Sequence, residues 1–309
     1  MTDTRQYILR TLAYFDLFQY PLTEKEIHLF HGQPCRPAMI NGAMQSLLAD
    51  KLIFSLNEFY ALHDDMALAS RRRLGNQIAA EHMKIAYHAA KLLSRFPYVK
   101  GLAISGSLSK NYSTEKGDID FFIITTANRL WIARTLMHLY KKLTFITGRQ
   151  QWFCMNYYVD EAGLEIEEKN IYTAIEIATL LPMRGRMSID KFIQANAWTK
   201  KYLPGYLREE TQSPEPQKGF FASLIEKIFN GKMGEWLDNK LMRITDKRWQ
   251  KKVERNKKND KGFNIGMMVG KHFSKPNPVF FQDKILELYA EKINALPRFE
   301  PELGMVSGK

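Results

Sequence analysis

Residues 104–124 read ISGSLSKNYSTEKGDIDFFII, and they decide how the centre of the chain folds. Apolar residues run up to Gly106 and start again directly after Asp120, with a polar spacer between the two runs. Apolar runs that are bounded by glycine and polar residues are typical of buried strands joined by a turn. We therefore expect one strand that ends at Gly106 and Ser107, and a second strand that opens with Asp118 and Asp120.

This pattern places carboxylates and backbone where they can do chemistry. Asp118 and Asp120 lie two residues apart in the expected strand, so their side chains project from the same face. Two neighbouring carboxylates repel each other unless a divalent cation lies between them. Mg²⁺ suits such a pair because it binds one or two carboxylates together with phosphate oxygens. Gly106 lets the backbone approach a phosphate closely, and Ser107 adds a hydroxyl donor, so the residues predict a metal and phosphate site.

A purely structural interpretation of the same residues stays open. Asp118 would then cap a turn after Gly117, and Asp120 would be a polar residue at a strand edge. We favour the functional interpretation because Asp120 borders four apolar residues, and an acid beside a buried strand needs a partner or a metal. Lys110 and Lys116 in the spacer could meet phosphate charge, but they are equally well explained as solvated loop lysines.

The order of apolar strand, Gly-Ser, spacer and Asp-x-Asp opening a second apolar strand resembles the signature of the nucleotidyltransferase superfamily. The fold of that superfamily is shared by polymerase β and many small bacterial transferases, and the resemblance covers about residues 98–160. The segments NYYVDEAGLEIEEKNIYTAIEIA (156–178) and ANAWTKKYLP (195–204) resemble a group of predicted bacterial nucleotidyltransferases. The resemblance implies a small mixed-sheet core, bound Mg²⁺ and transfer of a nucleotidyl group from a nucleoside triphosphate to an acceptor hydroxyl.

The resemblance also implies roles for individual residues. Gly106 and Ser107 would hold the β and γ phosphates, with Lys110 beside them, and Asp118 and Asp120 would hold one or two metal ions. Attack of the acceptor hydroxyl on the α-phosphate would then release pyrophosphate.

A third carboxylate is expected on a later strand of this fold, and the sequence departs from the pattern there. The next predicted strand, residues 152–159 (WFCMNYYV), contains no acid, and Asn156 takes the plausible inward position. Asn156 can ligate a metal weakly, but it cannot accept a proton from the acceptor. Glu165 and Glu167 on the following segment are the alternatives.

Strict alternation along this strand would place Cys154, Asn156 and Tyr158 on one face. Asn156 is the one good oxygen ligand of the three, so we expect it to stand near the acid pair. Catalysis would then be slow or undetectable.

The first seventy residues have the pattern of three helices followed by a β-hairpin, which is the order of a winged helix. Thr23 stands three residues before Glu26 and predicts a capping box at the second helix. The phrase YFDLFQYPLT (14–23) resembles the opening of the winged-helix unit that precedes some bacterial nucleotidyltransferase domains. Residues 37–48 of the third helix contain no Lys or Arg, so we expect contacts with protein rather than reading of DNA.

The composition agrees with a folded protein that binds a polyanion. A length of 309 residues suits two or three modest domains, and the net charge of +12 favours nucleic acid, nucleotide or an anionic membrane face, unless the surface is simply basic. Two cysteines are too few for a disulfide framework. The absence of any stretch of about 18 consecutive apolar residues excludes a membrane span. We expect a cytoplasmic protein with no membrane among its partners.

We thus expect an α+β fold of three parts: a winged-helix-like unit (1–70), a nucleotidyltransferase core with a leading helix (71–163) and a helical region (164–309). Residues 220–275 hold fourteen Lys and Arg against six acids, which suits nucleic acid as the acceptor or a solvated basic face. The favoured function is Mg²⁺-dependent nucleotidyl transfer to an acceptor that the sequence does not identify. The alternative is a catalytically silent module that binds nucleotide or nucleic acid.

Overall fold

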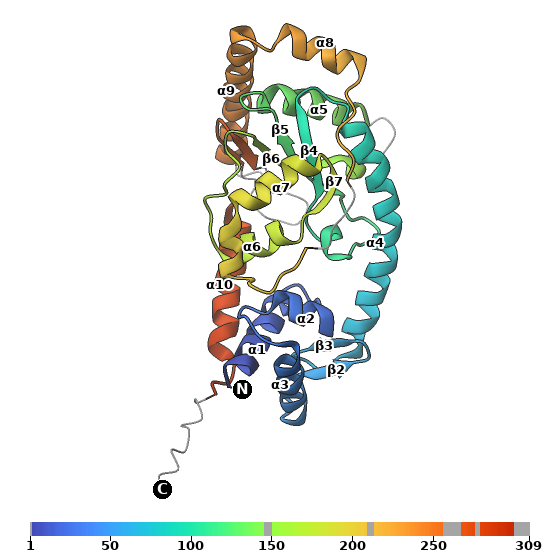
Figure 1. The fold of residues 1–309 in the computed structure, drawn as a ribbon, viewed down its shortest axis with the longest axis vertical. Coiled ribbons are helices and arrows are strands. Elements are labelled where there is room, and N and C mark those ends of the chain that lie inside the picture. The colour runs from blue at the N-terminus through green and yellow to red at the C-terminus, as the bar shows by residue number, and fades with distance from the viewer. Residues whose placement is uncertain (1, 145–149, 209–212, 256–266, 276–278, 300–309) are drawn as a thin grey trace.

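The structure of the protein is a computed structural model that describes residues 2–144, 150–208, 213–255, 267–275 and 279–299. It is a mixed α+β fold, as the sequence predicts, with two separate sheets. The N-terminal unit lies at one end of an elongated molecule, and the larger sheet with its helices occupies the other end (Figure 1).

The N-terminal unit contains three helices and a small antiparallel sheet of strand order β1-β3-β2. Its elements are α1 (Thr2–Asp16), β1 (Leu22–Thr23), α2 (Glu24–Phe30), α3 (Pro37–Ala49), β2 (Phe54–Leu56) and β3 (Phe59–Ala61). The predicted capping box is present, since the Thr23 hydroxyl accepts from the Glu26 amide and the Glu26 carboxylate accepts from the Thr23 amide. The predicted order of three helices and a hairpin is therefore confirmed, with β1 as an addition.

The larger sheet is mixed and has the strand order β7-β4-β5-β6-β9-β8. Its strands are β4 (Val99–Ile104), β5 (Asp120–Thr125), β6 (Cys154–Asp160), β7 (Leu181–Arg184), β8 (Met268–Val269) and β9 (Phe273–Lys275). β5 and β6 are parallel and are joined through helix α5 (Leu130–Thr144), whereas the other neighbours are antiparallel.

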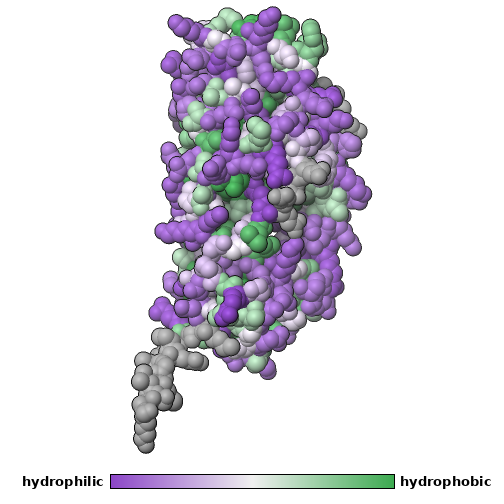
Figure 2. Space-filling model, viewed as in Figure 1, coloured by the Kyte–Doolittle hydropathy of each residue, from purple (hydrophilic) through white to green (hydrophobic). Residues whose placement is uncertain are grey.

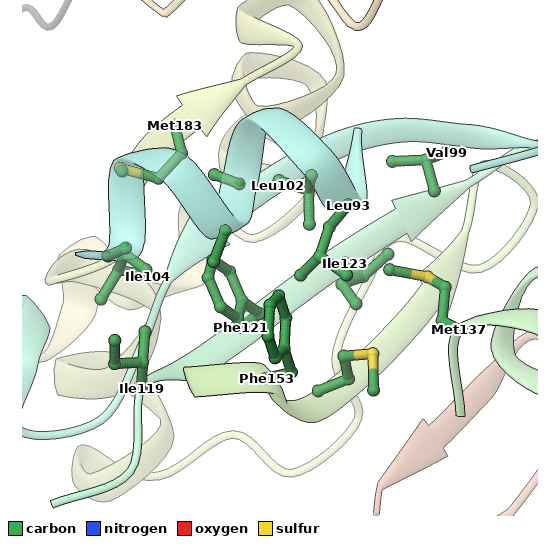
Figure 3. Packing of buried hydrophobic residues seen from close by; sticks show 14 of the residues in the cluster. Leu93, Val99, Leu102, Ile104, Ile119, Phe121, Ile123, Met137, Phe153 and Met183 are labelled. Atoms are coloured by element: carbon green, nitrogen blue, oxygen red, sulfur yellow. The ribbon is translucent and has the colours of Figure 1, made fainter. Parts of the chain in front are cut away.

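Helices cover both faces of this sheet. On one face, side chains of β4, β5 and β6 pack against α5 and the 28-residue helix α4 (Met66–Leu93). Figure 3 shows Ile104, Ile119 and Phe121 among the side chains of this core. On the other face, Phe122 and its neighbours pack against α6 (Ile171–Ala178) and α7 (Arg186–Ala195). The central strands are thus buried on both sides, which explains their continuous apolar sequence.

The expectation of a helical region from residue 164 onward is wrong in one respect. The region does hold α6, α7, α8 (Phe220–Ile228), α9 (Lys232–Glu254) and α10 (Val279–Ala295), but it also supplies β7, β8 and β9 to the larger sheet. These strands have two to four residues, too few to show an alternating pattern. β7 contains Pro182, which is compatible with the sheet edge where β7 lies.

The N-terminal unit is joined to the rest by shared packing. Its core includes Ile175 of α6 and Ile285 of α10, and Tyr14 makes an edge-on contact with Tyr289 at 5.4 Å between ring centroids. Buried Arg72 of α4 donates to the Glu26 carboxylate at 2.7 Å and to the Pro21 carbonyl at 2.8 Å. Within the described residues, no helix is both long and apolar enough to cross a membrane.

Candidate functional site: the turn after β4 and the acid pair at the start of β5

The turn after β4 is built around Gly106. Its φ of +67° belongs to the left-handed region, which glycine adopts without strain. A Cβ at this position would lie only 2.6 Å from Oδ2 of Asp120, so the acid of the next strand lies directly over the glycine. Conformation and close approach both require glycine here, and the turn and the acid form one structural unit.

The chain after Gly106 forms a short 3₁₀ helix, η1 (Leu108–Lys110). The Gly106 carbonyl accepts from the Ser109 hydroxyl at 2.8 Å and from Nζ of Lys110 at 3.0 Å. Ser107 is exposed, and its hydroxyl makes no capping hydrogen bond to η1. The turn therefore presents Ser107 outward while Lys110 folds back over the backbone.

Asp120 opens β5, whereas Asp118 lies two residues before the strand, so the expectation of a strand that opens with both acids is wrong by two residues. That the two side chains share a face stays a prediction. Ile119 between them is buried in the core beneath α4, whereas Asp118 is exposed and Asp120 is half-buried. The Ser105 amide donates to the Asp120 carbonyl at 2.9 Å, which fixes the end of β4 against the start of β5. The structure thus brings Gly106 and Asp120 into contact, and Asp118 is close enough to Asp120 for its charge to raise the pKa of that acid.

Asp120 holds a proton more tightly than an ordinary aspartic acid. Burial is the main reason that its pKa is raised to about 6, and the negative charges of Asp118 and Glu176 raise it further. A hydrogen bond from Cys154 and the positive charge of Lys141 act in the opposite direction. A carboxylate that is destabilised by burial and by like charges has a strong affinity for a cation.

Cys154 is the residue of β6 that lies directly opposite Asp120 in the parallel ladder. Burial and the neighbouring Asp120 carboxylate raise the pKa of its thiol, so it stays protonated at neutral pH and donates to Asp120. A thiol in this form neither binds Mg²⁺ well nor accepts a proton. Cys154 therefore occupies the position on β6 where a third acid could join the pair, and it can neither bind Mg²⁺ well nor accept a proton.

A β-bulge changes the faces that were expected for β6. Phe121 pairs with Met155 and Phe122 pairs with Tyr157, so Asn156 has no partner residue in β5. Because the bulge adds one residue, Tyr158 packs in the α4 and α5 core, and the expectation that it shares a face with Cys154 is wrong. Asn156 is half-exposed at the bulge, and its role beside the acid pair stays a prediction.

Lys110 is held by an acid that the sequence did not single out. Its Nζ lies 2.8 Å from Oε1 of Glu176 on α6, so the cation is neutralised when no phosphate is present. Glu176 is the one acid in the otherwise apolar helix IYTAIEIA, and a charge that is carried into a packed core needs a partner. That rule could have identified Glu176 from the sequence.

The two acids that were considered as substitutes form contacts elsewhere. Glu165 makes an exposed ion pair with Lys169 at 2.7 Å. Glu167 lies near Tyr157, whose pKa is raised by burial and by the charges of Glu168 and Glu167. Besides Asp118, Glu176 is thus the carboxylate whose charge raises the pKa of Asp120.

The N-terminal unit holds the turn from the outside. The Tyr20 hydroxyl donates to the Lys110 carbonyl, and the Tyr20 ring makes an edge-on contact with Tyr112 at 5.8 Å between centroids. Tyr112 in turn lies against Gly75 of α4, where an added Cβ would be 2.2 Å from the ring. This close approach explains a glycine inside a long helix, and it fixes the spacer of the motif against α4.

The residues present fit a divalent cation that takes part of its coordination from elsewhere. Within the described residues, no three His, Cys, Asp or Glu side chains form a group that could hold a metal ion. Asp118 and Asp120 supply two carboxylates, and their mutual repulsion would be relieved by a cation. Mg²⁺ accepts such a partial site because phosphate oxygens and water complete its octahedron.

Comparison of the chain with protein-family models, with curated proteins and with solved structures finds no match.

Proposed function

We propose that the protein is a Mg²⁺-dependent nucleotidyltransferase that binds a nucleoside triphosphate between the Gly106 turn and the acids Asp118 and Asp120 at the start of β5. The observation that carries the proposal is the position of the Asp120 carboxylate directly over Gly106, with exposed Asp118 beside it. A phosphate chain at the turn and a cation on the two acids would then share one small space.

Each residue of the site has a distinct task in this proposal. Backbone amides of the turn and the exposed Ser107 hydroxyl would hold phosphate oxygens. Lys110 would exchange its ion pair with Glu176 for one with the phosphates, since the carboxylate and the phosphates are both anionic. Asp118 and Asp120 would hold Mg²⁺, which supplies neutralisation of the triphosphate and activation of the acceptor hydroxyl. The acceptor oxygen would form a bond to the α-phosphorus while the bond from that phosphorus to the β-phosphate bridging oxygen breaks.

A catalytically silent nucleotide-binding module is the second candidate, and Cys154 supports it. Without an acid at that position, the proton of the acceptor hydroxyl must leave to Asp118, Asp120 or water. Transfer would be slow, and binding of nucleotide could be the whole function.

The N-terminal unit has the element order of a winged helix, and we propose that it supports the site rather than reads DNA. Helix α3 contains no Lys or Arg, which argues against phosphate contacts in a major groove. The bond from Tyr20 to the Lys110 carbonyl supports a role in holding the turn.

The test is a thermal-shift series with ATP, GTP, CTP and UTP, with and without Mg²⁺, followed by a pyrophosphate-release assay on any nucleotide that binds. We expect a shift that needs Mg²⁺ and that disappears when Asp118→Asn is combined with Asp120→Asn. Glu165→Gln is the matched control, because Glu165 is an exposed acid that pairs with Lys169. An unchanged shift in the double variant would remove the metal-site assignment. Nucleotide binding without pyrophosphate release would favour the silent module.

A further inference from the structure

The outer face of α8 exposes large apolar side chains. Phe220 is 79% exposed and Phe221 is 77% exposed, and Leu224 and Ile228 are exposed as well. Residues 221, 224 and 228 follow helical spacing, so they form one stripe. The adjoining side of α8 is already packed, because Ile225 contacts the core beside Tyr98. The stripe therefore lies next to the side of α8 that is used in folding, and it is left exposed.

The start of α9, which three residues separate from the end of α8, exposes further apolar side chains. Met233 is 51% exposed and Trp236 is 60% exposed. We call the combined surface the apolar tip; it consists of Phe220, Phe221, Leu224, Ile228, Met233 and Trp236. Figure 1 places α8 and the start of α9 at the end of the molecule farthest from the N-terminal unit, and Figure 2 shows hydrophobic residues at that end among hydrophilic ones. Exposed apolar patches of this kind mark surfaces that are covered in function.

Exposed lysines outnumber exposed acids on residues 220–240, which carry the apolar tip and in which Glu235 is the one exposed acid. Lys227, Lys232 and Lys240 are exposed, and Nζ of Lys240 lies 4.7 Å from the centroid of the Trp236 ring. The basic surface continues along α9 with a set of exposed residues: Arg243, Lys247, Arg248, Lys251 and Lys252. The surface that covers the tip must accept apolar side chains at its centre and supply negative charge around them.

These two properties separate the candidate partners. A nucleic acid would meet the lysines, but it offers no place for the aliphatic side chains of Leu224, Ile228 and Met233. A second copy of the chain would bring two sets of lysines together, and like charges at an interface cost affinity. An anionic lipid surface meets both demands, since aromatic and aliphatic side chains enter the region below the headgroups while lysines contact lipid phosphates.

We propose that the apolar tip binds the surface of an anionic lipid bilayer and holds the protein there as a peripheral protein. The expectation of no membrane partner rested on the lack of a spanning segment, which does not bear on surface binding. The proposal is also independent of nucleotidyl transfer, because the tip contains no residue of the acid pair or of the Gly106 turn.

The test is co-sedimentation of the full-length protein with vesicles of phosphatidylcholine alone or mixed with phosphatidylglycerol. We expect binding to the mixed vesicles that weakens with salt. The triple variant Phe220→Ser, Phe221→Ser and Leu224→Ser should bind at least about tenfold more weakly. Its matched control is Leu74→Ser with Leu207→Ser, which removes exposed leucines elsewhere and should bind as the native protein does.

A charge series completes the test. Replacing Lys227, Lys232 and Lys240 by alanine should weaken binding to the mixed vesicles by about fivefold for each lysine removed. All variants lie on the surface, and unchanged circular dichroism would show that they fold. Equal binding by the triple variant would overturn the proposal. The proposal would also be overturned if the native protein did not bind mixed vesicles. It would be overturned as well if the native protein self-associated and the triple variant did not, or if the native protein bound RNA and the triple variant did not.

Discussion

Replacement of Asp120 by asparagine should stabilise the metal-free protein at neutral pH. The pKa of Asp120 rises from 3.8 to about 6 on folding, a change of about two units. At ~1.4 kcal/mol for each unit, the ionised carboxylate lowers the free energy of unfolding by up to about 3 kcal/mol. Between pH 4 and pH 6 the folded state binds more protons than the unfolded state, so native stability falls as the pH rises through this window. The penalty is complete above about pH 6.

Urea denaturation in the presence of a chelator would measure this effect. At pH 7.5 the free energy of unfolding of Asp120→Asn should exceed that of the native protein by roughly 1–3 kcal/mol, since the amide is neutral but still polar. At pH 4 the two free energies of unfolding should agree within about 0.5 kcal/mol. Asp118→Asn is the control, because Asp118 is exposed and its replacement should change stability by less than about 0.5 kcal/mol. The reasoning would be refuted if the stability difference between Asp120→Asn and the native protein were no larger at pH 7.5 than at pH 4. The pKa of Asp120 would then not be raised by folding.

The same site yields three further expected outcomes. Cys154→Asp should destabilise the metal-free protein by about 1–3 kcal/mol, recover stability with Mg²⁺ and speed pyrophosphate release more than Asn156→Asp does, because Cys154 is the residue directly opposite Asp120; the reverse ranking would contradict the register argument. Gly106→Ala should cost about 1–3 kcal/mol in urea denaturation, because of its positive φ and the contact with Asp120, and a neutral result would contradict the close approach. Glu176→Gln should free Lys110 and tighten Mg²⁺-triphosphate binding in calorimetry, and weaker binding would instead place Glu176 among the groups that hold the metal.

The strand–turn–strand unit could be predicted because its signals are local. The glycine, the apolar runs and the two acids lie within about twenty residues of sequence, and the structure brings Gly106 and Asp120 into contact. The N-terminal helices and the Thr23 capping box were predictable for the same reason. Each of these features depends on neighbours in the sequence.

The parts that the sequence did not reveal depend on distant segments. The bulge at Asn156 is set by pairing with β5, and alternation alone placed Tyr158 on the wrong face. Glu176 and Lys141 act on Asp120 from α6 and α5, so their proximity follows only from the packing of those helices on the sheet. β8 and β9 are too short for a periodic pattern and are recognised only through their partners.

The order β7-β4-β5-β6-β9-β8 has a consequence for how the chain reaches its native state. β4 and β5 are close in sequence and can pair early. The outer edge of β6 stays unpaired until β9 is present, because Ser274 and Phe273 of β9 follow their partners Tyr158 and Val159 by more than a hundred positions. Asp160, which is buried, also lacks its partner His272 (3.0 Å away in the folded protein) until that segment has been made. During synthesis, β4 and β6 would each show an unpaired edge, and open edges recruit strands from other chains. We therefore expect slow folding with a high contact order, and aggregation of any fragment that stops before residue 275.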